Sequence, residues 1–336
     1  MSVRVGIIGL GYWGPNVLRN FAMQPGCDMA WGCDLSEKNR AKAARQYPAI
    51  RMTERAEDLF EDPTLELVII ATPPASHFPL AKAALEAGKH VFIEKPLTPT
   101  TKEADALVKL AKQKRRRIFV DHTFMFAPAV TQMAAFVQRG LLGRLLYFDS
   151  TRINLGIIQK DTNVLWDLAI HDLSILSTFI DLRSAVSVSA NGKAFFGKQE
   201  EVAHLHLSFK NGFQAHIHAS WLSPVKLRSS ILAGSRAMIT YDDTQPSEKL
   251  RIYDRGIEHD HTKPDPFFPV YRSGDILIPS LDGGETLSIE AEHVIRCLQG
   301  KEEPLASGAA GRAMVAILEA ATRAMRTGKT LPLKLR

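Results

Sequence analysis

The sequence VRVGIIGLGYWG, residues 3–14, decides the fold of the N-terminal part of the chain. Its first half is an apolar run typical of a buried strand, and its second half carries the pattern G-x-G-x-x-G at Gly9, Gly11 and Gly14. Glycines at this spacing permit a tight turn and a close approach of the backbone to a pyrophosphate, which the N-terminus of the next helix then faces. The stretch therefore predicts a dinucleotide-binding site.

The end of the second predicted strand supports this prediction. Asp34 lies about twenty residues beyond the glycines, where a carboxylate accepts hydrogen bonds from the adenosine ribose and repels a 2′-phosphate. An alternative is that Asp34 only caps the helix that follows, but Ser36 is the better capping residue. We therefore expect NAD as the cofactor, while Lys38 and Arg40 leave NADP open.

The first third of the chain alternates apolar runs with helical patterns. Strands are expected at residues 3–8, 28–33, 67–71, 91–93 and 118–120, and helices at 14–23, 36–47, 76–87 and 101–114. Ser76 is expected to cap the third of these helices and Gly88 to end it. Alternation of this kind predicts a parallel sheet with helices on both faces, which is the α/β Rossmann architecture. We place this domain at residues 1–121.

After residue 121, alternating apolar and polar residues dominate the sequence. Strands are expected at residues 145–153, 185–196, 202–209, 213–221, 228–233 and 250–253, and helices at 164–180, 286–299 and 308–327. These patterns predict an α+β domain over residues 122–336, built on a large, mostly antiparallel and open-faced sheet. Residues 254–284 are rich in glycine, proline and charge, and are expected to form a long loop.

The register of one hairpin in this sheet follows from the sequence. A loop of three residues, Lys210–Gly212, places glycine where a left-handed backbone is needed and pairs Leu205 with Ile217. This register puts four histidines on one face of the sheet: His204, His206, His216 and His218. No carboxylate or cysteine joins them, so we expect no metal there. We expect the open face to pack against another copy of the chain in a dimer or tetramer.

The composition of the 336 residues is typical of a soluble globular protein, with 45% hydrophobic and 23% charged residues. The formal charge of +6 suits an anionic ligand, and the basic run Lys112–Arg117 is expected at a helix end rather than on nucleic acid. Three cysteines show no metal-ligand or disulfide spacing, and no apolar run is long enough to span a membrane. We therefore expect a cytoplasmic protein.

A charged pair closes one of the predicted strands. Residues 91–93 are followed by Glu94, Lys95 and Pro96. Open α/β sheets bind ligands at the carboxyl ends of their strands, so this pair is a candidate site. The alternative is a solvated ion pair in front of a loop proline.

A second candidate pair lies in the later half of the chain. Asp167 and His171 are four residues apart, so they share one face of the predicted helix. A carboxylate beside an imidazole favours its protonated form and restrains its orientation, which suits a general base. The alternative is a capped or salt-bridged helix start.

Three motifs in this order resemble the glucose–fructose oxidoreductase/inositol dehydrogenase (Gfo/Idh/MocA) family: ATPPASH at Ala71–His77, AGKHV at Ala87–Val91 and EKPL at Glu94–Leu97. The resemblance covers essentially the whole chain and implies a Rossmann domain followed by an open-faced α+β domain. It also implies that Lys95 touches the nicotinamide ribose and the reacting hydroxyl group. The D-x-x-x-H pair would then supply His171 as the proton acceptor.

The resemblance implies two further sets of residues around a small-molecule sugar substrate. Besides the three glycines and Asp34, the cofactor is expected to contact Tyr12, Trp13, Thr72, His77, Glu94 and Lys95. The substrate is expected to contact His122, Arg152 and Asn154, together with the catalytic residues Lys95, Asp167 and His171.

A branch of the family is also indicated. Gly11–Asn16, Arg152–Gly156 and Asn163–Asp172 resemble the enzymes that oxidise nucleotide sugars, such as UDP-N-acetylglucosaminuronate 3-dehydrogenases, which implies a role in polysaccharide biosynthesis. Asp121 and Met125 depart from the family's pattern and leave the sugar open. The alternatives are a dehydrogenase of a free sugar or cyclitol, a keto-sugar reductase, and a non-catalytic dinucleotide sensor on the same fold.

Overall fold

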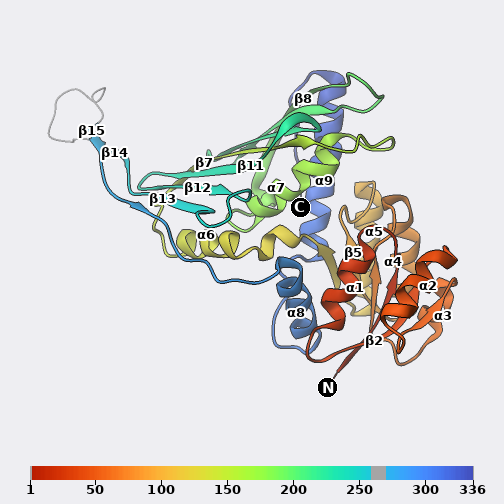
Figure 1. Ribbon diagram of the computed structural model, residues 1–336. Helices are drawn as coiled ribbons and strands as arrows, with labels where there is room; N and C mark the ends of the chain where they lie inside the picture. The colour runs from red at the N-terminus through yellow and green to blue at the C-terminus, as the bar shows by residue number, and fades with distance from the viewer. Residues whose placement is uncertain (1, 259–269, 336) are drawn as a thin grey trace. The chain divides into compact units, whose positions relative to one another are not determined.

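The computed structural model describes residues 2–258 and 270–335, whose packing divides the chain into two compact units (Figure 1). The units are formed by residues 1–126 with 284–316, and by residues 127–283 with 317–336. The sequence places a single boundary at residue 121, close to the end of the first segment. It also places residues 284–316 in the second domain, whereas this segment packs with the first unit.

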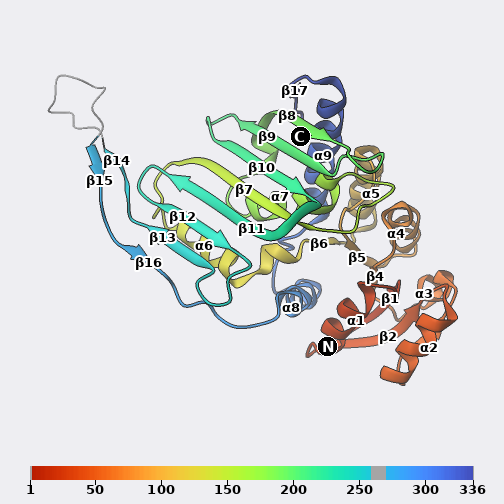
Figure 2. The same ribbon diagram turned by 45° about the horizontal axis from the view of Figure 1, so that its top comes forward.

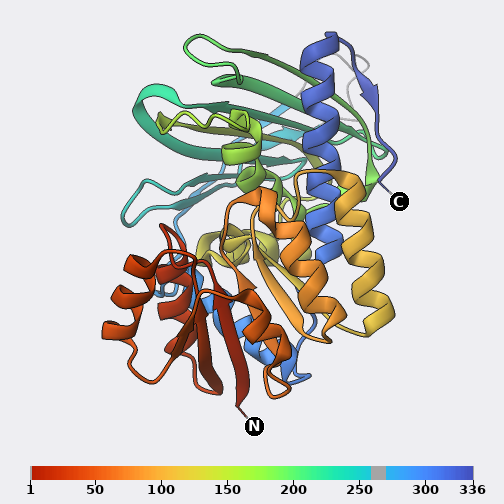
Figure 3. The ribbon, with the colours of Figure 1, turned by 90° about the vertical axis from the view of Figure 1, so that its right-hand side faces the viewer.

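The first unit contains a six-stranded sheet with the strand order β3-β2-β1-β4-β5-β6, in which all neighbouring strands are parallel. This is the order of a dinucleotide-binding Rossmann fold, as the sequence predicts. Figure 3 shows these strands between helices. The strands are β1 (Val3–Ile8), β2 (Cys27–Cys33), β3 (Arg51–Thr53), β4 (Leu67–Ile70), β5 (His90–Glu94) and β6 (Ile118–Asp121).

The helices of this unit are α1 (Gly14–Ala22), α2 (Glu37–Gln46), α3 (Ala56–Glu61), α4 (His77–Glu86), α5 (Thr101–Lys114) and α8 (Thr286–Leu298), with short 3₁₀ turns η1 (Pro74–Ser76) and η2 (Thr123–Phe126). The apolar side of α8 completes the core of the sheet. Leu287, Ala291 and Val294 of this helix are buried in one cluster with Val5 and Phe92 of the strands. This packing explains why the segment returns to the first unit.

The second unit contains a nine-stranded sheet with the order β16-β13-β12-β11-β7-β10-β9-β8-β17 (Figure 2). Among the described strands, β10 and β7 are parallel and the other neighbours are antiparallel, which confirms the predicted sheet. The strands are β7 (Leu145–Leu155), β8 (Ala185–Lys193), β9 (Val202–Phe209), β10 (Gln214–Ser220), β11 (Leu222–Gly234), β12 (Met238–Asp242), β13 (Leu250–Tyr253), β16 (Ile276–Leu277) and β17 (Leu331–Pro332).

Helices cover one face of this sheet and leave the other open. They are α6 (Pro128–Gln138), the π-helix η3 (Leu165–Ala169), α7 (Ile170–Ser177), the 3₁₀ turn η4 (Leu182–Ser184) and the C-terminal part of α9 (Gly308–Thr327). Figure 1 shows α6 and α7 on the same side of the strands. Along β9, Ala203, Leu205 and Leu207 are buried on this side, whereas His204 and His206 are only half-buried on the other. Burial therefore alternates with period two, as the sequence indicates.

The predicted hairpin is confirmed. Leu205 pairs with Ile217, His206 with His216 and His204 with His218. Gly212 has a φ of 84°, the left-handed conformation that the three-residue loop requires.

Several elements differ from the sequence-based expectations. Helix α6 was not expected, although Pro128 at its first turn is a helix-start signal. The short β3 and α3 were also missed, because three and six residues show no clear period. The segment expected to be a loop contains β16 and the strand pair β14 (Gly256–Glu258) and β15 (Val270–Arg272), while residues 259–269 lie outside the described part of the chain. Within the described residues, no helix is long and apolar enough to cross a membrane.

Candidate active site

The glycine-rich turn after β1 forms a cradle for an anionic group. A Cβ atom on Gly9, whose φ is 100°, would overlap the carbonyl oxygen of Ala71, and one on Gly14 would overlap the carbonyl oxygen of Gly9. At Gly11 a Cβ atom would meet no other heavy atom within 4 Å, so this side of the turn is open. Helix α1 begins here with no acidic residue in its first turn. The residues present therefore fit the pyrophosphate of a dinucleotide.

Asp34 fastens this turn to the end of β2. Its carboxylate accepts hydrogen bonds from the backbone N–H groups of Leu10 at 2.7 Å and Ser36 at 2.8 Å. A carboxylate has about four acceptor positions, so it retains room for two ribose hydroxyl groups. The guanidinium group of Arg40 donates instead to the backbone carbonyls of Asp34 and Leu35, at 2.7 and 3.0 Å. This arrangement favours a ribose with free hydroxyl groups over a 2′-phosphate.

Tyr12 and Trp13 are the two residues between Gly11 and Gly14, and their side chains lie in different surroundings. Tyr12 is 95% exposed, so its ring is available to a ligand. Trp13 donates its indole N–H to the carboxylate of Asp121 at 2.9 Å. The indole nitrogen of Trp13 is thus hydrogen-bonded to a protein side chain, and the expected contact of Trp13 with the cofactor stays a prediction.

His77 joins two loops at the ends of β4 and β5. Its ring nitrogens lie 2.8 Å from the carbonyl oxygen of Thr72 and 2.8 Å from that of Pro96, and the side chain is completely buried. Burial lowers the pKa of His77, and the two carbonyl oxygens oppose this shift. The imidazole was expected at the cofactor, but its buried position supports a different role, which is to hold the backbone on either side of Lys95.

A hydroxyl group completes this loop contact. Ser76 was expected to cap α4, but its hydroxyl group donates to the side chain of Thr72 at 2.7 Å and to the carbonyl oxygen of Pro73 at 2.8 Å. The capping expectation is therefore wrong, since Thr72 competes for the same hydroxyl group. The Thr72 side chain is consequently restrained where the resemblance places the cofactor.

The Glu94-Lys95 pair lies at the carboxyl end of β5, as the sequence predicts. Glu94 is in register with Asp121 of β6, and the side chains of Glu94 and Lys95 are half-buried. Burial and the charge of Lys95 lower the pKa of His122 to about 3. Neither ring nitrogen of His122 has a hydrogen-bond partner within the described residues. His122 is thus a buried neutral imidazole, and its expected contact with the substrate stays a prediction.

In the second unit, the predicted acid–base pair begins α7. Asp167 lies in the π-helix and His171 in the α-helix that continues it. The expected single helix is therefore interrupted by a wider turn, a feature found frequently at functional sites. The indole N–H of Trp221 donates to Asp167 at 2.9 Å, and Trp166 donates to Thr322 of α9 at 3.0 Å.

Trp221 lies beside the predicted acid–base pair, although the sequence pattern assigns it no role in the site. A Cβ atom on Gly156 would lie 2.9 Å from both the Asn154 amide nitrogen and the Trp221 ring, so these two side chains are neighbours. Trp221 therefore brings the predicted substrate residue Asn154 close to Asp167. The available signal was a tryptophan at the end of an alternating strand pattern, and Trp221 is only 1% exposed.

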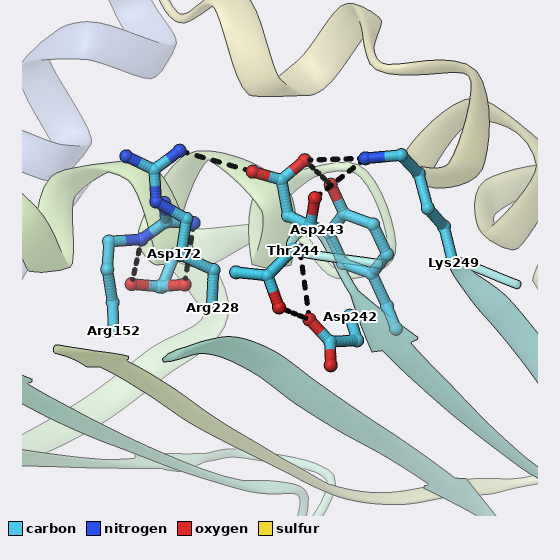
Figure 4. Close-up of polar contacts among 8 residues, drawn as sticks. Arg152, Asp172, Arg228, Asp242, Asp243, Thr244 and Lys249 are labelled. Atoms are coloured by element: carbon cyan, nitrogen blue, oxygen red, sulfur yellow. Dashed lines mark hydrogen bonds and ion pairs between the residues drawn. The ribbon is translucent and has the colours of Figure 1, made fainter. Parts of the chain in front are cut away.

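Arg152 plays a structural part in the second unit (Figure 4). Its guanidinium group contacts Asp172 at 2.9 and 3.1 Å, and Ser150 donates to the same carboxylate at 2.7 Å. The side chains of this ion pair are 2% and 3% exposed. Because Asp172 follows His171 directly, the pair fixes the start of α7. The expected contact of Arg152 with the substrate stays a prediction.

A second arginine lies opposite this one. Arg228 of β11 is in register with Arg152 and contacts Asp243 at 3.2 Å, while Lys249 lies 3.5 Å from the same carboxylate (Figure 4). Asp243 is held ionised by these contacts, which outweigh the effect of burial and lower its pKa. The positive charge of Arg228 is therefore partly neutralised by a carboxylate.

Comparison with known proteins places the chain in a family. Residues 3–122 match the oxidoreductase family with an NAD-binding Rossmann fold, and residues 130–240 match the GFO/IDH/MocA C-terminal domain. The chain belongs to the Gfo/Idh/MocA family of oxidoreductases. Its first unit is accordingly an NAD-binding domain, as the glycine-rich turn predicts.

Individual relatives cover almost the whole chain. UDP-N-acetylglucosamine 3-dehydrogenase from Acidithiobacillus ferrooxidans is 26% identical over 324 residues, or 94% of this chain and 95% of the relative. Its structure matches with a TM-score of 0.83 at 25% identity, over 97% of this chain and 98% of that chain. scyllo-Inositol 2-dehydrogenase (NAD(+)) from Bacillus subtilis is 23% identical over 100% of this chain and 97% of its own. Levoglucosan dehydrogenase, in complex with NADH and levoglucosan, shares the fold with a TM-score of 0.85 at 20% identity, over 99% of each chain.

The Asp34 geometry generates a prediction about cofactor choice. We expect NAD to bind at least about tenfold more tightly than NADP, a difference of about 1.4 kcal/mol. Asp34→Ser removes the repulsion of a 2′-phosphate, so this variant should bind the two cofactors with similar affinity. Calorimetric titration of both proteins with both cofactors tests this. A wild-type preference for NADP would show that Arg40 governs the pocket instead.

The burial of His122 generates a prediction about stability in acid. Its pKa of about 3 lies below the value of about 6.5 in an unfolded chain. Between these two pH values the imidazole is protonated only in the unfolded chain. The free energy of unfolding therefore falls by up to about 1.4 kcal/mol for each unit by which the pH is lowered. Urea unfolding between about pH 4.5 and 7 should show a shallower loss of stability in His122→Phe. The wild type is the reference, and an equal slope in His122→Phe would contradict the expectation.

Proposed function

We propose that this NAD-dependent oxidoreductase oxidises a hydroxyl group of a nucleotide sugar. The observation that carries the proposal is the pair of Asp167 and His171 on an anchored π-to-α helix, since a base and a carboxylate are what removal of a hydroxyl proton needs. The Acidithiobacillus relative, named as a UDP-N-acetylglucosamine 3-dehydrogenase and matched along nearly its full length, supports the substrate class. We include in the proposal a role in making activated sugars for polysaccharides.

The chemistry assigns a separate task to each residue. The Lys95 ammonium group polarises the reacting hydroxyl group and stabilises the developing alkoxide. His171 accepts the hydroxyl proton, and Asp167 orients the imidazole or binds a neighbouring hydroxyl group. NAD, when bound, would supply the acceptor for the hydride that leaves the same carbon. The substrate thus loses one proton and one hydride and becomes a ketone.

Two other functions are kept as alternatives. The relatives named as scyllo-inositol and levoglucosan dehydrogenases favour a free cyclitol or sugar, or the reverse reduction of a keto-sugar. A non-catalytic dinucleotide sensor is the alternative of another class, and the retention of Lys95, Asp167 and His171 argues against it. Mass spectrometry of small molecules that co-purify with the protein, followed by assays of reduction of NAD with each, separates these functions.

The open face of the second unit supports a proposal about assembly. On this face the ring of His204 stacks on those of His218 and His216, with ring centroids 4.3 and 5.9 Å apart. Asp149 lies 4.0 Å from His216 on the same face. We propose that this face forms the contact of a dimer or tetramer, because an uncovered sheet face of this size in a two-layer unit is otherwise left to solvent.

Variants at the proposed catalytic residues should separate chemistry from cofactor binding. We expect Lys95→Met and His171→Asn each to lower the rate of turnover by about 10²–10³-fold, since alkoxide stabilisation and proton transfer are lost. Asp167→Asn should have an intermediate effect. Steady-state oxidation of the identified sugar from about pH 6 to 10 tests this, and His171→Asn should lose the acid limb of the profile.

The control for these variants is cofactor binding. None of the residues holds the adenosine half of the cofactor, so NAD affinity should change only modestly in each. Lys102→Met removes an exposed lysine of the same unit and should leave both rate and affinity unchanged. If Lys95→Met kept most of its activity, the sensor would become the better assignment.

Acid should weaken the proposed assembly. Burial lowers the pKa of His204 and His218, so their imidazoles are neutral at neutral pH and charge as the pH falls below their ordinary range. Charged imidazoles at His204 and His218, whose ring centroids are 4.3 Å apart, repel one another, and Asp149 offsets only part of this repulsion. Sedimentation at about pH 8 and about pH 5.5 should therefore show smaller species in acid. The double variant His204→Gln, His218→Gln should dissociate less, and an unchanged wild-type size at both pH values would refute the role of this face.

A further inference from the structure

Two buried carboxyl groups lie beside the glycine-rich turn and have no part in the proposed chemistry. Asp121 ends β6 and is 2% exposed, and Glu290 on α8 is 1% exposed. Both belong to the first unit. Buried carboxylates normally have a cationic partner or several hydrogen-bond donors, so this pair needs an explanation.

Asp121 is the hydrogen-bonded member of the pair. One of its carboxyl oxygens accepts the indole N–H of Trp13 at 2.9 Å, and the other accepts the hydroxyl group of Thr123. Each of its two oxygens therefore has a donor aimed at it.

The hydrogen bonding of Glu290 differs from that of Asp121. Neither of its carboxyl oxygens makes a hydrogen bond of normal geometry within the described residues. The groups facing it are Asp121 and Thr123, with the carboxylate of Glu94 farther along the same side of the sheet. Burial first, and then the charge of Asp121, raise the pKa of Glu290 well above its usual range. At neutral pH Glu290 therefore carries a proton that it can share with Asp121.

We propose that Asp121 and Glu290 act as one proton-sharing pair that positions Trp13, and with it the glycine-rich turn, for the pyrophosphate of the cofactor. Trp13 is the residue that caps α1, and its carbonyl oxygen accepts hydrogen bonds from the backbone N–H groups of Asn16 and Val17. A shift of Trp13 consequently moves the first turn of the helix that faces the pyrophosphate. Asp121 and Glu290 are positioning residues, because they act through Trp13.

The pair makes cofactor binding sensitive to alkali. When the pair holds one proton, it carries one negative charge, and Asp121 accepts the hydrogen bond from the indole N–H of Trp13. Loss of that proton leaves two carboxylates in a buried space with Glu94 nearby, and their repulsion separates Asp121 from its present position. The contact with Trp13 is then lost, and the turn relaxes.

Titration with NADH across pH tests the proposal, because NADH is stable in alkali and its binding can be followed without turnover. The wild-type dissociation constant should rise about tenfold between about pH 7 and pH 10. Glu290→Gln keeps the shape and supplies an amide donor at every pH, so its affinity should change less than about twofold over the same range. Glu292→Gln neutralises an exposed carboxylate on the same helix and should behave like the wild type.

A third variant tests the route through the indole. Trp13→Phe removes the N–H group that Asp121 accepts, so this variant should bind NADH about tenfold more weakly at neutral pH and show little further loss in alkali. Infrared spectra of the wild type should contain a protonated carboxyl band at neutral pH that disappears in alkali. Wild-type affinity that does not vary with pH, an alkaline loss that persists in Glu290→Gln, or the absence of that band would each overturn the proposal.

Discussion

The first unit depends on one steric constraint, which is that the backbone after β1 must pass too close to its neighbours for side chains. Gly9 and Gly14 satisfy this constraint. A Cβ atom on Gly9 would overlap the carbonyl oxygen of Ala71 after β4, and a Cβ atom on Gly14 would overlap the carbonyl oxygen of Gly9. A turn made of such residues has little side-chain packing of its own, so other elements must hold it. Asp34 does so from β2 through Leu10, and Asp121 does so from β6 through Trp13. Both anchors are carboxylates, which places negative charge behind the turn and leaves its open side to an anion.

The second unit solves a similar positioning problem with buried polar contacts. The helix carrying Asp167 and His171 is fixed by Trp221 at one end and by the Arg152–Asp172 ion pair directly after it. Desolvation makes such an ion pair a weak source of stability, whereas loss of one partner is costly by about 3–5 kcal/mol. Its value here is geometric, because it allows one orientation of α7. The π-helix then turns Asp167 toward the Trp221 indole instead of leaving it on a regular helical face.

Local sequence patterns were sufficient for the two sheets, the glycine-rich turn and the hairpin register, because each rests on a period or a turn that neighbouring residues specify. Partners distant in sequence were not predictable in this way. The Arg152–Asp172 ion pair is one example, since nothing near Arg152 in the sequence reveals Asp172 as its partner. His77 and Ser76 were expected at the cofactor and at a helix cap, but both bond to loop atoms that only the folded chain brings together. Helix α8 likewise has an ordinary amphipathic pattern, and its place in the first unit follows from the core that it completes.

The buried titratable groups of the first unit have a common consequence for the reaction. His77 and His122 have pKa values lowered by burial, and Glu290 has a pKa raised by burial, so these three groups keep one protonation state through the neutral range. Asp34, Glu94, Lys95 and Asp121 are other ionisable groups around the glycine-rich turn and the end of β5. The buried imidazoles and Glu290 therefore add no change of charge near the cofactor over the neutral range. In the function that we propose, proton exchange during turnover is assigned to His171 of the second unit.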